Sequence, residues 1–382
     1  MTTTSPPVDS ATVDSQSLAH GQLGTTLLHI EHALQGSTTW DHVHQQLTGI
    51  SPLLTGPHAS LYLGAPAMAY VLHLAAAGSN RYARTLNSLD HVVTEIARHR
   101  VAAAHHRIDQ AHPTSFAEYD LFRGLTGIGA LLLRRRPDSS ELRAVLAYLV
   151  RLTQPLPGAR NRGRPGWWVG HSPTLDKQAT PGGHANVGIA HGITGPLALL
   201  ALAHLRGVVV DGQEEAMQRI CRWLDDLQHT DRGRIQWPRW VAQSGAERAP
   251  LAAPSWCYGT PGLARAQQLA ALALGDQRRK KSAERALLSC IDDEAQLNKL
   301  TGRGLCHGFG GLLRTVQRVA QDADDPEAFT SRLPTLRNRF RNQPIPDEPG
   351  FLTGTVGAIL VDLGTAANHP PVSEWDACLL LT

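Results

Sequence analysis

A pattern that recurs six times constrains the fold of this 382-residue chain more than any other feature. In each copy a glycine, followed three residues later by a second glycine or an alanine, opens an apolar run of helical composition. The leading glycines are Gly64, Gly124, Gly192, Gly259, Gly308 and Gly354. This spacing leaves room for two helices and their connections in each repeat.

More polar stretches lie between the copies, and their apolar residues recur three and four apart, as on an outward-facing helix. These stretches are Asp90–Ala104, Glu141–Leu152, Glu214–Gln228, Arg278–Ile291 and Pro326–Arg341. The runs after the glycines are apolar nearly all round, as expected of inner helices. We predict an all-α fold, an α/α toroid of six to seven helical hairpins with inner and outer helix rings. The paired glycines are expected where helix backbones approach at the narrow centre, and no stretch shows strand-type alternation.

Three segments of the chain differ in composition. Residues 1–20 are expected to form a disordered N-terminal tail, because the first seventeen are rich in Ser, Thr, Pro and Val. Residues 21–382 are expected to form a single domain. Within it, residues 155–184 are rich in Pro, Gly and Trp and read as a loop or insertion. Trp167 and Trp168 are expected to fold back onto the body; the alternative is contact with a peptide.

Composition excludes several classes of protein. The charge is only +3, from 36 basic and 33 acidic residues, and no basic stripe is present, so a nucleic-acid partner is not expected. The most apolar helical stretch, Gly195–Leu205, is much shorter than the ~20 residues that a membrane span needs. Five irregularly spaced cysteines do not form a disulfide framework, which favours a cytoplasmic protein.

Three potential metal ligands precede two successive glycines of the repeat. Cys257 stands two residues before Gly259, and Cys306 and His307 directly precede Gly308. Zinc prefers thiolate and imidazole, and three protein ligands with an open fourth position are typical of a catalytic site. We predict one Zn²⁺ per chain at this set. The alternative is that the two cysteines are buried small hydrophobic residues, as we interpret Cys221, Cys290 and Cys378.

Three further residues occupy matching positions. His191 directly precedes Gly192, and an imidazole can both accept and return a proton near neutral pH. Asp120, four residues before Gly124, would orient His191 or share its proton transfer, or would instead cap the following helix. Tyr258 would donate a hydrogen bond to a developing oxyanion, or would merely pack.

Three fragments in this order resemble the lanthionine synthetase C-like family, in particular its stand-alone class I lanthipeptide cyclases. They are GIAHGITG (Gly188–Gly195), WCYGTPG (Trp256–Gly262) and LCHGFGG (Leu305–Gly311). EYDLFRGLTGIG (Glu118–Gly129) and FLTGTVGAIL (Phe351–Leu360) are similar to two further segments of that family. The similarity extends from about Leu61 to the end of the chain.

The resemblance implies an α/α toroid around zinc, with Cys257, Cys306 and His307 as the ligands. It implies His191 as the acid/base, with Asp120 and Tyr258 as neighbouring active-site residues. The implied reaction is the Michael-type addition of precursor-peptide cysteine thiols to dehydroalanine or dehydrobutyrine, which forms lanthionine and methyllanthionine thioether rings.

The implied partners are a dehydrated precursor peptide with its leader, a separate dehydratase and an exporter. The chain is too short to carry a fused dehydratase or kinase domain, and the implied location is cytoplasmic, either free or peripheral in a membrane-associated complex. One departure is Ala253, which stands where some relatives carry Arg four residues before the first zinc cysteine; Arg248 is the candidate replacement.

Other functions are compatible with parts of this pattern. A non-catalytic, leader-binding scaffold of the same family would bind peptide without forming thioethers, and the intact set of six site residues argues against it. A relative that joins glutathione to dehydroamino acids in proteins would keep the thiol activation and change the substrate. An α/α-toroid glycosidase would need two central carboxylates, and only Asp120 is placed there.

Overall fold

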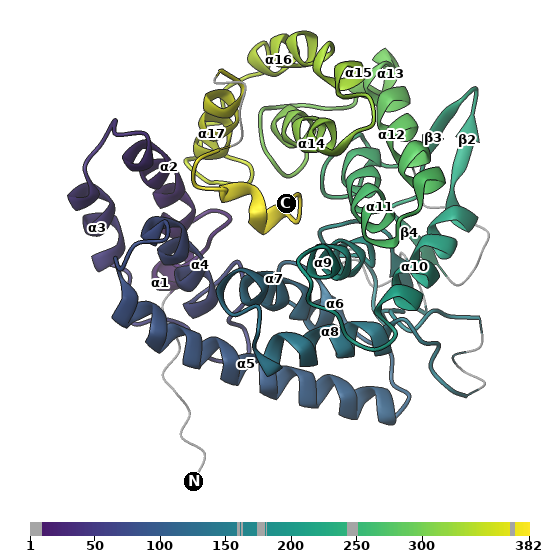
Figure 1. Ribbon diagram of the computed structural model, residues 1–382, viewed down its shortest axis with the longest axis horizontal. Coiled ribbons are helices and arrows are strands. Elements are labelled where there is room, and N and C mark those ends of the chain that lie inside the picture. The colour runs from purple at the N-terminus through teal and green to yellow at the C-terminus, as the bar shows by residue number, and fades with distance from the viewer. Residues whose placement is uncertain are drawn as a thin grey trace.

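Inner helices form a closed ring around the centre of the molecule (Figure 1). The computed structural model describes residues 10–158, 161, 163–173, 180, 182–242, 251–366 and 371–382. Within these residues the inner helices are α2 (Gln22–Leu34), α4 (Ala65–Ala76), α7 (Leu125–Arg135), α9 (Thr194–Leu205), α11 (Thr260–Leu274), α14 (Phe309–Asp322) and α17 (Thr355–Ala366). Each packs against the next and α17 packs against α2, so the ring is continuous. This arrangement is the predicted α/α toroid.

A second set of helices covers the ring from outside. It comprises α3 (Trp40–Thr48), α5 (Ala83–Asp109), α8 (Ser140–Leu152), α10 (Gln213–Leu227), α12 (Gln277–Ile291), α15 (Pro326–Thr330) and α16 (Leu333–Arg341). All five polar stretches named from the sequence lie here, although 326–341 is divided between α15 and α16. The remaining helices are short: α1 (Ser10–Ser15), α6 (Phe116–Tyr119), α13 (Glu294–Leu297) and the 3-10 helix η2 (Trp375–Leu379). None of the described helices is both long and apolar enough to cross a bilayer.

In six copies, all except that at Gly64, which has Ala67, the second glycine is required by the loop that leads into the helix. We call this segment, which comprises the leading glycine and the four residues before it, the pre-helix loop. A Cβ there would lie 1.9–2.6 Å from the carbonyl oxygen six residues earlier, in the copies at Gly24, Gly127, Gly195, Gly262, Gly311 and Gly357. We expected these glycines to separate neighbouring helices. Their closest contact is instead with their own loop, which folds back over the first turn of the helix. Gly24 also reveals a copy, beginning at Gly21, that the sequence pattern did not show.

Backbone hydrogen bonds join the pre-helix loops of neighbouring inner helices into a ring. The donors and acceptors are Leu18 N to Tyr62 O, Leu121 N to Ala190 O, Ala190 N to Cys257 O, Cys257 N to Cys306 O, Cys306 N to Leu352 O and Leu352 N to Ala19 O, at 3.0–3.3 Å. At the remaining junction the Tyr62 and Phe122 rings stack with centroids 4.3 Å apart. Equivalent positions of successive loops therefore lie side by side.

The C-terminal segment, residues 371–382, occupies the centre of the toroid (Figure 1). Its backbone carbonyls accept hydrogen bonds from inner side chains, including Tyr62 to Cys378 at 2.8 Å and Trp256 to Leu379 at 3.1 Å. Leu379, Leu380 and Leu381 are almost fully buried. The segment thus fills the space that seven converging helices leave, and its bond to Trp256 is one residue from the metal-ligand candidate Cys257.

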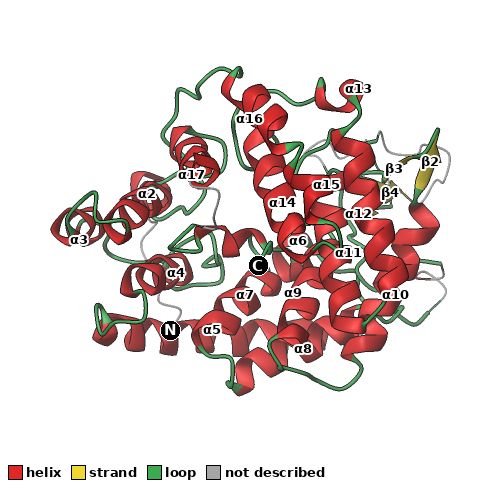
Figure 2. Cartoon of the chain, turned by 45° about the horizontal axis from the view of Figure 1, so that its top comes forward, coloured by secondary structure: helices red, strands yellow, loops and turns green. Residues whose placement is uncertain are grey.

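Two small antiparallel sheets lie on one side of the helical body (Figure 2). β1 (His184–Asn186) pairs with β4 (Trp240–Ala242), and β2 (His229–Asp231) pairs with β3 (Arg234–Gln236). The sequence showed no strand-type alternation here, because strands of three residues are too short to show an alternation of apolar and polar side chains.

The tail predicted for residues 1–20 is wrong in part. Residues 10–20 contain α1 and the buried Leu18 and Ala19, which pair with two other loops of the ring; residues 1–9 lie outside the described residues. In 155–184, the described positions before His184 contain no α-helix or extended strand. Trp167 and Trp168 are buried there, as expected of residues that fold back onto the body.

Candidate metal centre and active site

Cys257, Cys306 and His307 converge at the N-terminal ends of α11 and α14. Their ligand atoms lie within 4.8 Å of one another, and no other such group of three is found among the described residues. The bond from Cys257 N to Cys306 O, 3.2 Å, holds the two cysteines side by side. Because Cys306 and His307 belong to a loop and not to α14, adjacent residues can point toward one centre. All five cysteines of the chain are free.

This donor set fits a zinc ion. Ligand atoms of a tetrahedral Cys₂His site are roughly 3.5–3.8 Å apart, so small side-chain rotations would complete the geometry from the observed separations. Cys257 is buried, Cys306 is half-buried and His307 is exposed. A fourth ligand could therefore approach from the side of His307, as a catalytic site requires.

The two thiols differ in acidity. The pKa of Cys257 is lowered to about 7, above all by a hydrogen bond from Cys306 and in spite of burial; Ser255 and the charges of His191 and Arg239 lower it further. The same contact and burial raise the pKa of Cys306. The pair therefore forms a thiolate and a thiol readily, and a cation between the sulfurs would replace the shared proton.

His191 is held by Asp120, as one of the two sequence interpretations required. His191 Nδ1 lies 2.6 Å from Asp120 Oδ2, and the carboxylate is fully buried. The other oxygen, Oδ1, accepts the backbone N–H groups of Arg123 and Gly124 at 2.6 and 2.8 Å. One carboxylate thus both binds the loop before α7 and orients the imidazole. With Nδ1 engaged, Nε2 is the nitrogen free to exchange protons with a substrate.

Aromatic rings surround the His191 imidazole. It stacks on Phe122 with ring centroids 4.9 Å apart and an interplanar angle of 27°. Phe116 lies at 5.7 Å and Tyr258 at 6.2 Å. The Tyr119 hydroxyl donates to the His191 carbonyl oxygen at 3.2 Å. The sequence did not indicate the two phenylalanines, because phenylalanine in an apolar repeat predicts only core packing.

Tyr258 contacts both halves of the site. It follows Cys257 directly, and its ring packs on Gly188, where a Cβ would be 2.7 Å from Tyr258 Cδ1. Burial raises the pKa of Tyr258 to about 12, so the hydroxyl is a neutral hydrogen-bond donor at ordinary pH. Both roles considered for it, donor and packing residue, remain compatible with this position.

Two residues linked to the expected arginine have different outcomes. Ala253 is partly buried, and its carbonyl oxygen accepts the Ser255 N–H. The same oxygen lies close to Gly259. Arg248, the candidate replacement, lies outside the described residues. Its role stays a prediction.

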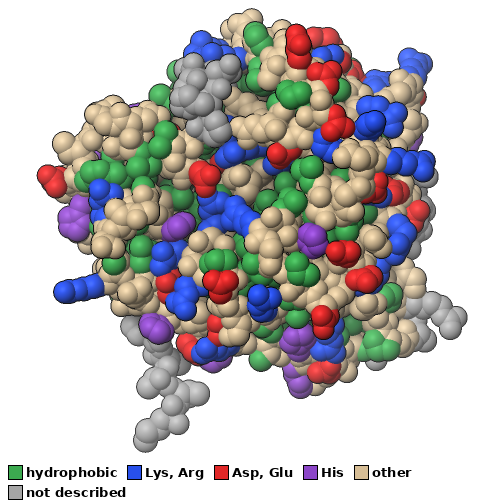
Figure 3. Space-filling model, in the orientation of Figure 1, with side chains coloured by type: hydrophobic (Ala, Val, Ile, Leu, Met, Phe, Trp, Pro, Cys, Tyr) green, Lys and Arg blue, Asp and Glu red, His purple; other side chains and the backbone are tan. Residues whose placement is uncertain are grey.

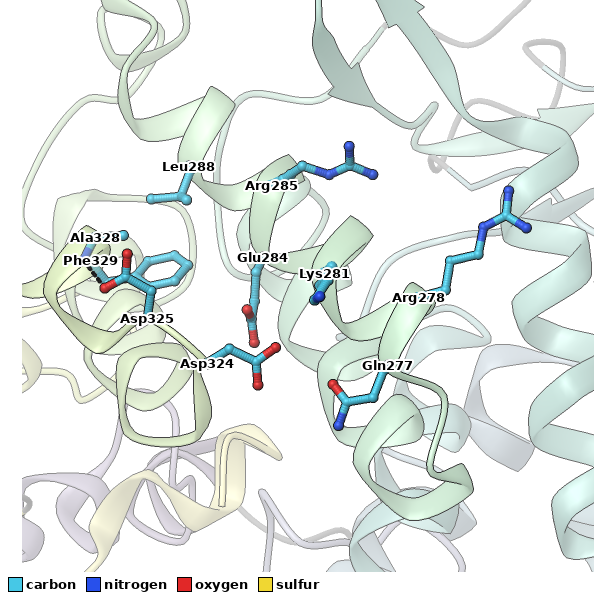
Figure 4. A pocket seen from close by; sticks show the side chains of 10 residues that line it. All are labelled: Gln277, Arg278, Lys281, Glu284, Arg285, Leu288, Asp324, Asp325, Ala328 and Phe329. Atoms are coloured by element: carbon cyan, nitrogen blue, oxygen red, sulfur yellow. Dashed lines mark hydrogen bonds between the residues drawn. The ribbon is translucent and has the colours of Figure 1, made fainter.

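A surface hollow of about 650 Å³ lies away from this site. It is bounded by α12, α15 and the connection before α15, and Figure 4 shows the side chains around it, among them Lys281, Glu284 and Phe329. None of the six site residues lines it. Charges of both signs are mixed on the face seen in Figure 3, without a continuous basic stripe. The six candidate site residues all lie in the ring of pre-helix loops, in four successive repeats.

The fold and this site together define an α/α-toroid protein in which a Cys–Cys–His group that could hold a metal ion lies beside a carboxylate-oriented histidine. The family model for lanthionine synthetase C-like proteins matches residues 12–380, and the chain belongs to that family.

Two individual proteins are similar over most of their length. The nisin biosynthesis protein NisC of Lactococcus lactis subsp. lactis is 25% identical over 347 residues, which is 86% of this chain and 78% of that protein. The solved structure of a nisin cyclase superposes with a TM-score of 0.80 at 22% identity, over 97% of this chain and 93% of that one. The toroid prediction is confirmed by this likeness.

Proposed function

We propose that this protein is a zinc-dependent lanthipeptide cyclase. It would catalyse the addition of precursor-peptide cysteine thiols to dehydroalanine or dehydrobutyrine in the same peptide, forming lanthionine and methyllanthionine rings. The observation that carries the proposal is the placement of two cysteines and a histidine next to the His191–Asp120 pair, in a member of this family. The similarity to NisC supports the substrate class.

The residues match the requirements of the reaction. The substrate thiol loses its proton, its sulfur bonds to the β-carbon, the double-bond electrons move toward the amide oxygen, and one proton adds to the α-carbon. Zinc, when bound at Cys257, Cys306 and His307, supplies the charge that favours the thiolate form of the substrate. His191 Nε2 takes up and delivers the proton, while Asp120 holds the ring and stabilises its charged form. The net addition needs no oxidant or other reagent.

The proposed reaction requires a peptide that another enzyme has dehydrated. We therefore place the protein in the cytoplasm, where it would receive its substrate from a separate dehydratase and pass the product to an exporter. Asp120 would position His191, and Tyr258 would serve as a neutral hydrogen-bond donor; its ring centroid lies 6.2 Å from that of His191.

The test uses purified protein and a synthetic peptide with one dehydroalanine and one cysteine two residues apart. Ring formation leaves the mass unchanged, so it is measured as the loss of alkylatable thiol against an enzyme-free control. We expect about one zinc per chain and thiol loss above the control rate. The His191→Ala variant should keep its zinc and lose the excess rate.

Two results would contradict the proposal. One is a folded, metal-free protein that forms no rings; the other is unchanged ring formation by His191→Ala. A parallel reaction with glutathione and a cysteine-free dehydropeptide separates the remaining possibility. A glutathione adduct without ring formation would assign the site to an intermolecular reaction.

A further inference from the structure

Arg239 lies beside the site, against the ring of Tyr258. Its guanidinium carbon is 4.7 Å from the centre of the Tyr258 ring and 5.2 Å from that of Trp240. No carboxylate of the described residues forms an ion pair with it, and its Nε is buried without a hydrogen-bond partner. Partly buried arginines are ordinarily paired, because removing a cation from water is unfavourable.

The backbone holds Arg239 in register with the loop that carries His191. Trp240 pairs with Asn186 in the β1–β4 sheet, and the Arg239 carbonyl accepts the Val187 N–H at 3.0 Å. His191 follows four residues after Val187. The two aromatic faces fix the position of the guanidinium through cation–π contacts, without using its hydrogen-bond donors.

The reaction creates negative charge on the substrate at a position other than the sulfur. When sulfur bonds to the β-carbon of a dehydroamino acid, electrons collect on the amide oxygen of the same residue. Cys257, Cys306 and His307 face the sulfur, and His191 serves the α-carbon. Tyr258 offers one neutral donor, and Arg239 lies against its ring.

We propose that Arg239 is a catalytic residue for the reaction inferred above, and that it binds the amide oxygen of the dehydroamino acid as this oxygen becomes an enolate. The terminal N–H groups donate to the oxygen, and the fixed positive charge stabilises the addition intermediate. No atom is transferred to or from Arg239. The inference rests on the proposed cyclase function and identifies the group that activates its electrophile.

The experiment compares Arg239→Gln and Arg239→Lys with wild type in the peptide assay, from pH 6 to pH 9. Arg222→Gln is the matched control, because Arg222 is an exposed cation on α10 outside the site. Zinc content and the unfolding midpoint are measured for every variant. Removing one preorganised donor to an oxyanion lowers kcat by about 10²-fold, and we expect a loss of that order in Arg239→Gln, with zinc retained. Arg239→Lys should recover part of it, because the charge remains.

The shape of the pH profile separates this role from an effect on the thiol. If Arg239 stabilises the enolate, its removal lowers kcat by the same factor at every pH. If Arg239 only promoted thiol ionisation, the acid limb of the profile would move to higher pH and the rate would return at pH 9. That shift would overturn the proposal, as would wild-type kcat in Arg239→Gln. If that variant does not fold, an Arg239→Lys enzyme with wild-type kcat overturns it too. A wild-type protein that binds zinc and forms no ring would remove the cyclase function and this role together.

Discussion

The environments of the five cysteines separate them into two kinds. Burial raises the pKa of Cys290 to about 12, whereas the pKa of Cys257 is lowered to about 7 by its neighbour Cys306. A thiol of the first kind is inert, and a pair of the second kind is suited to a metal. We therefore predict that Cys306→Ala loses at least 90% of its zinc and its ring-forming activity, measured by metal analysis and thiol alkylation. Cys290→Ala is the control and should keep both; equal zinc in the two variants would contradict the assignment.

The Asp120 carboxylate is expected to control the tautomer of His191. In Asp120→Asn the amide oxygen can still accept the two backbone N–H groups, but the amide nitrogen that faces His191 no longer favours a proton on Nδ1, so Nε2 loses its role in proton transfer. We expect kcat to fall by about 10²-fold or more, with zinc content unchanged. The measurement is the single-turnover rate on the dehydrated peptide. An unchanged rate would show that Asp120 serves only to bind the loop before α7.

At the level of single residues, the sequence predicted what depends on matched positions in the repeat. Cys257, Cys306, His307 and His191 each precede a repeat glycine, and this shared position brings them together. Arg239 could not be found in this way. It precedes a three-residue strand outside the repeats, and only the pairing of β1 with β4 places it beside Tyr258.

In every copy except that at Gly64, the pre-helix loop contacts the second glycine of the repeat, and Gly262 tests whether the loop depends on it. A Cβ at Gly262 would lie 2.0 Å from the Trp256 carbonyl oxygen, in the loop that carries Cys257. We predict that Gly262→Ala lowers the free energy of unfolding by about 1–3 kcal/mol or more and weakens zinc binding, because the loop must move. Urea unfolding and metal titration measure the two effects.

The control for Gly262 is Gly364, a glycine of α17 whose added Cβ meets nothing within 4 Å. Gly364→Ala should leave zinc binding unchanged and increase stability by up to about 1 kcal/mol, because alanine favours the helix. If both substitutions had the same effect, the close contact in the loop would not be what requires glycine at position 262.

The sequence predicted the positions of the helices better than the contacts that hold them in place. Helical periodicity located the inner and outer helices, because each buries one stripe or nearly its whole surface. It missed the copy at Gly21, which lies next to residues that read as a disordered tail. Residues 10–20 are ordered by contacts with loops far along the chain, such as Leu18 with Tyr62 and Ala19 with Leu352. Local composition does not contain that information.

The closed ring makes the two ends of the chain interdependent. The Glu31 carboxylate, on α2, accepts the backbone N–H groups of Val372 and Ser373, both at 3.0 Å. Asp376, in η2, accepts from Arg314 and Arg318 of α14 at 2.6 and 2.7 Å. The C-terminal segment thus connects the first and sixth inner helices across the centre. No local sequence pattern predicts these contacts, since Glu31 lies 341 residues before Val372 and Arg314 lies 62 residues before Asp376.

Asp376 is the most informative position for the stability of the whole toroid. Burial raises its pKa, but Arg314 and Arg318 outweigh this and hold the pKa down to about 2. In the unfolded chain an aspartate has a pKa of about 3.9, so the native state favours the charged form. The associated stability, about 2–3 kcal/mol, is present above pH 4 and is lost as the pH falls toward 2.

We predict that Asp376→Asn lowers the free energy of unfolding by about 3–5 kcal/mol at pH 6, because two arginines remain buried without their counter-charge. The difference between wild type and variant should shrink between pH 4 and pH 2, because protonation neutralises the wild-type side chain as well. Urea midpoints are measured with a chelator in every sample, so that metal release does not contribute. Asp225→Asn is the control, because the Asp225 carboxylate is 47% exposed and forms an ion pair with Arg279. Removing this pair should change stability by less than about 1 kcal/mol. A pH-independent difference between wild type and Asp376→Asn would mean that the charge of Asp376 does not stabilise the central segment, whose packing alone would then hold the ring together.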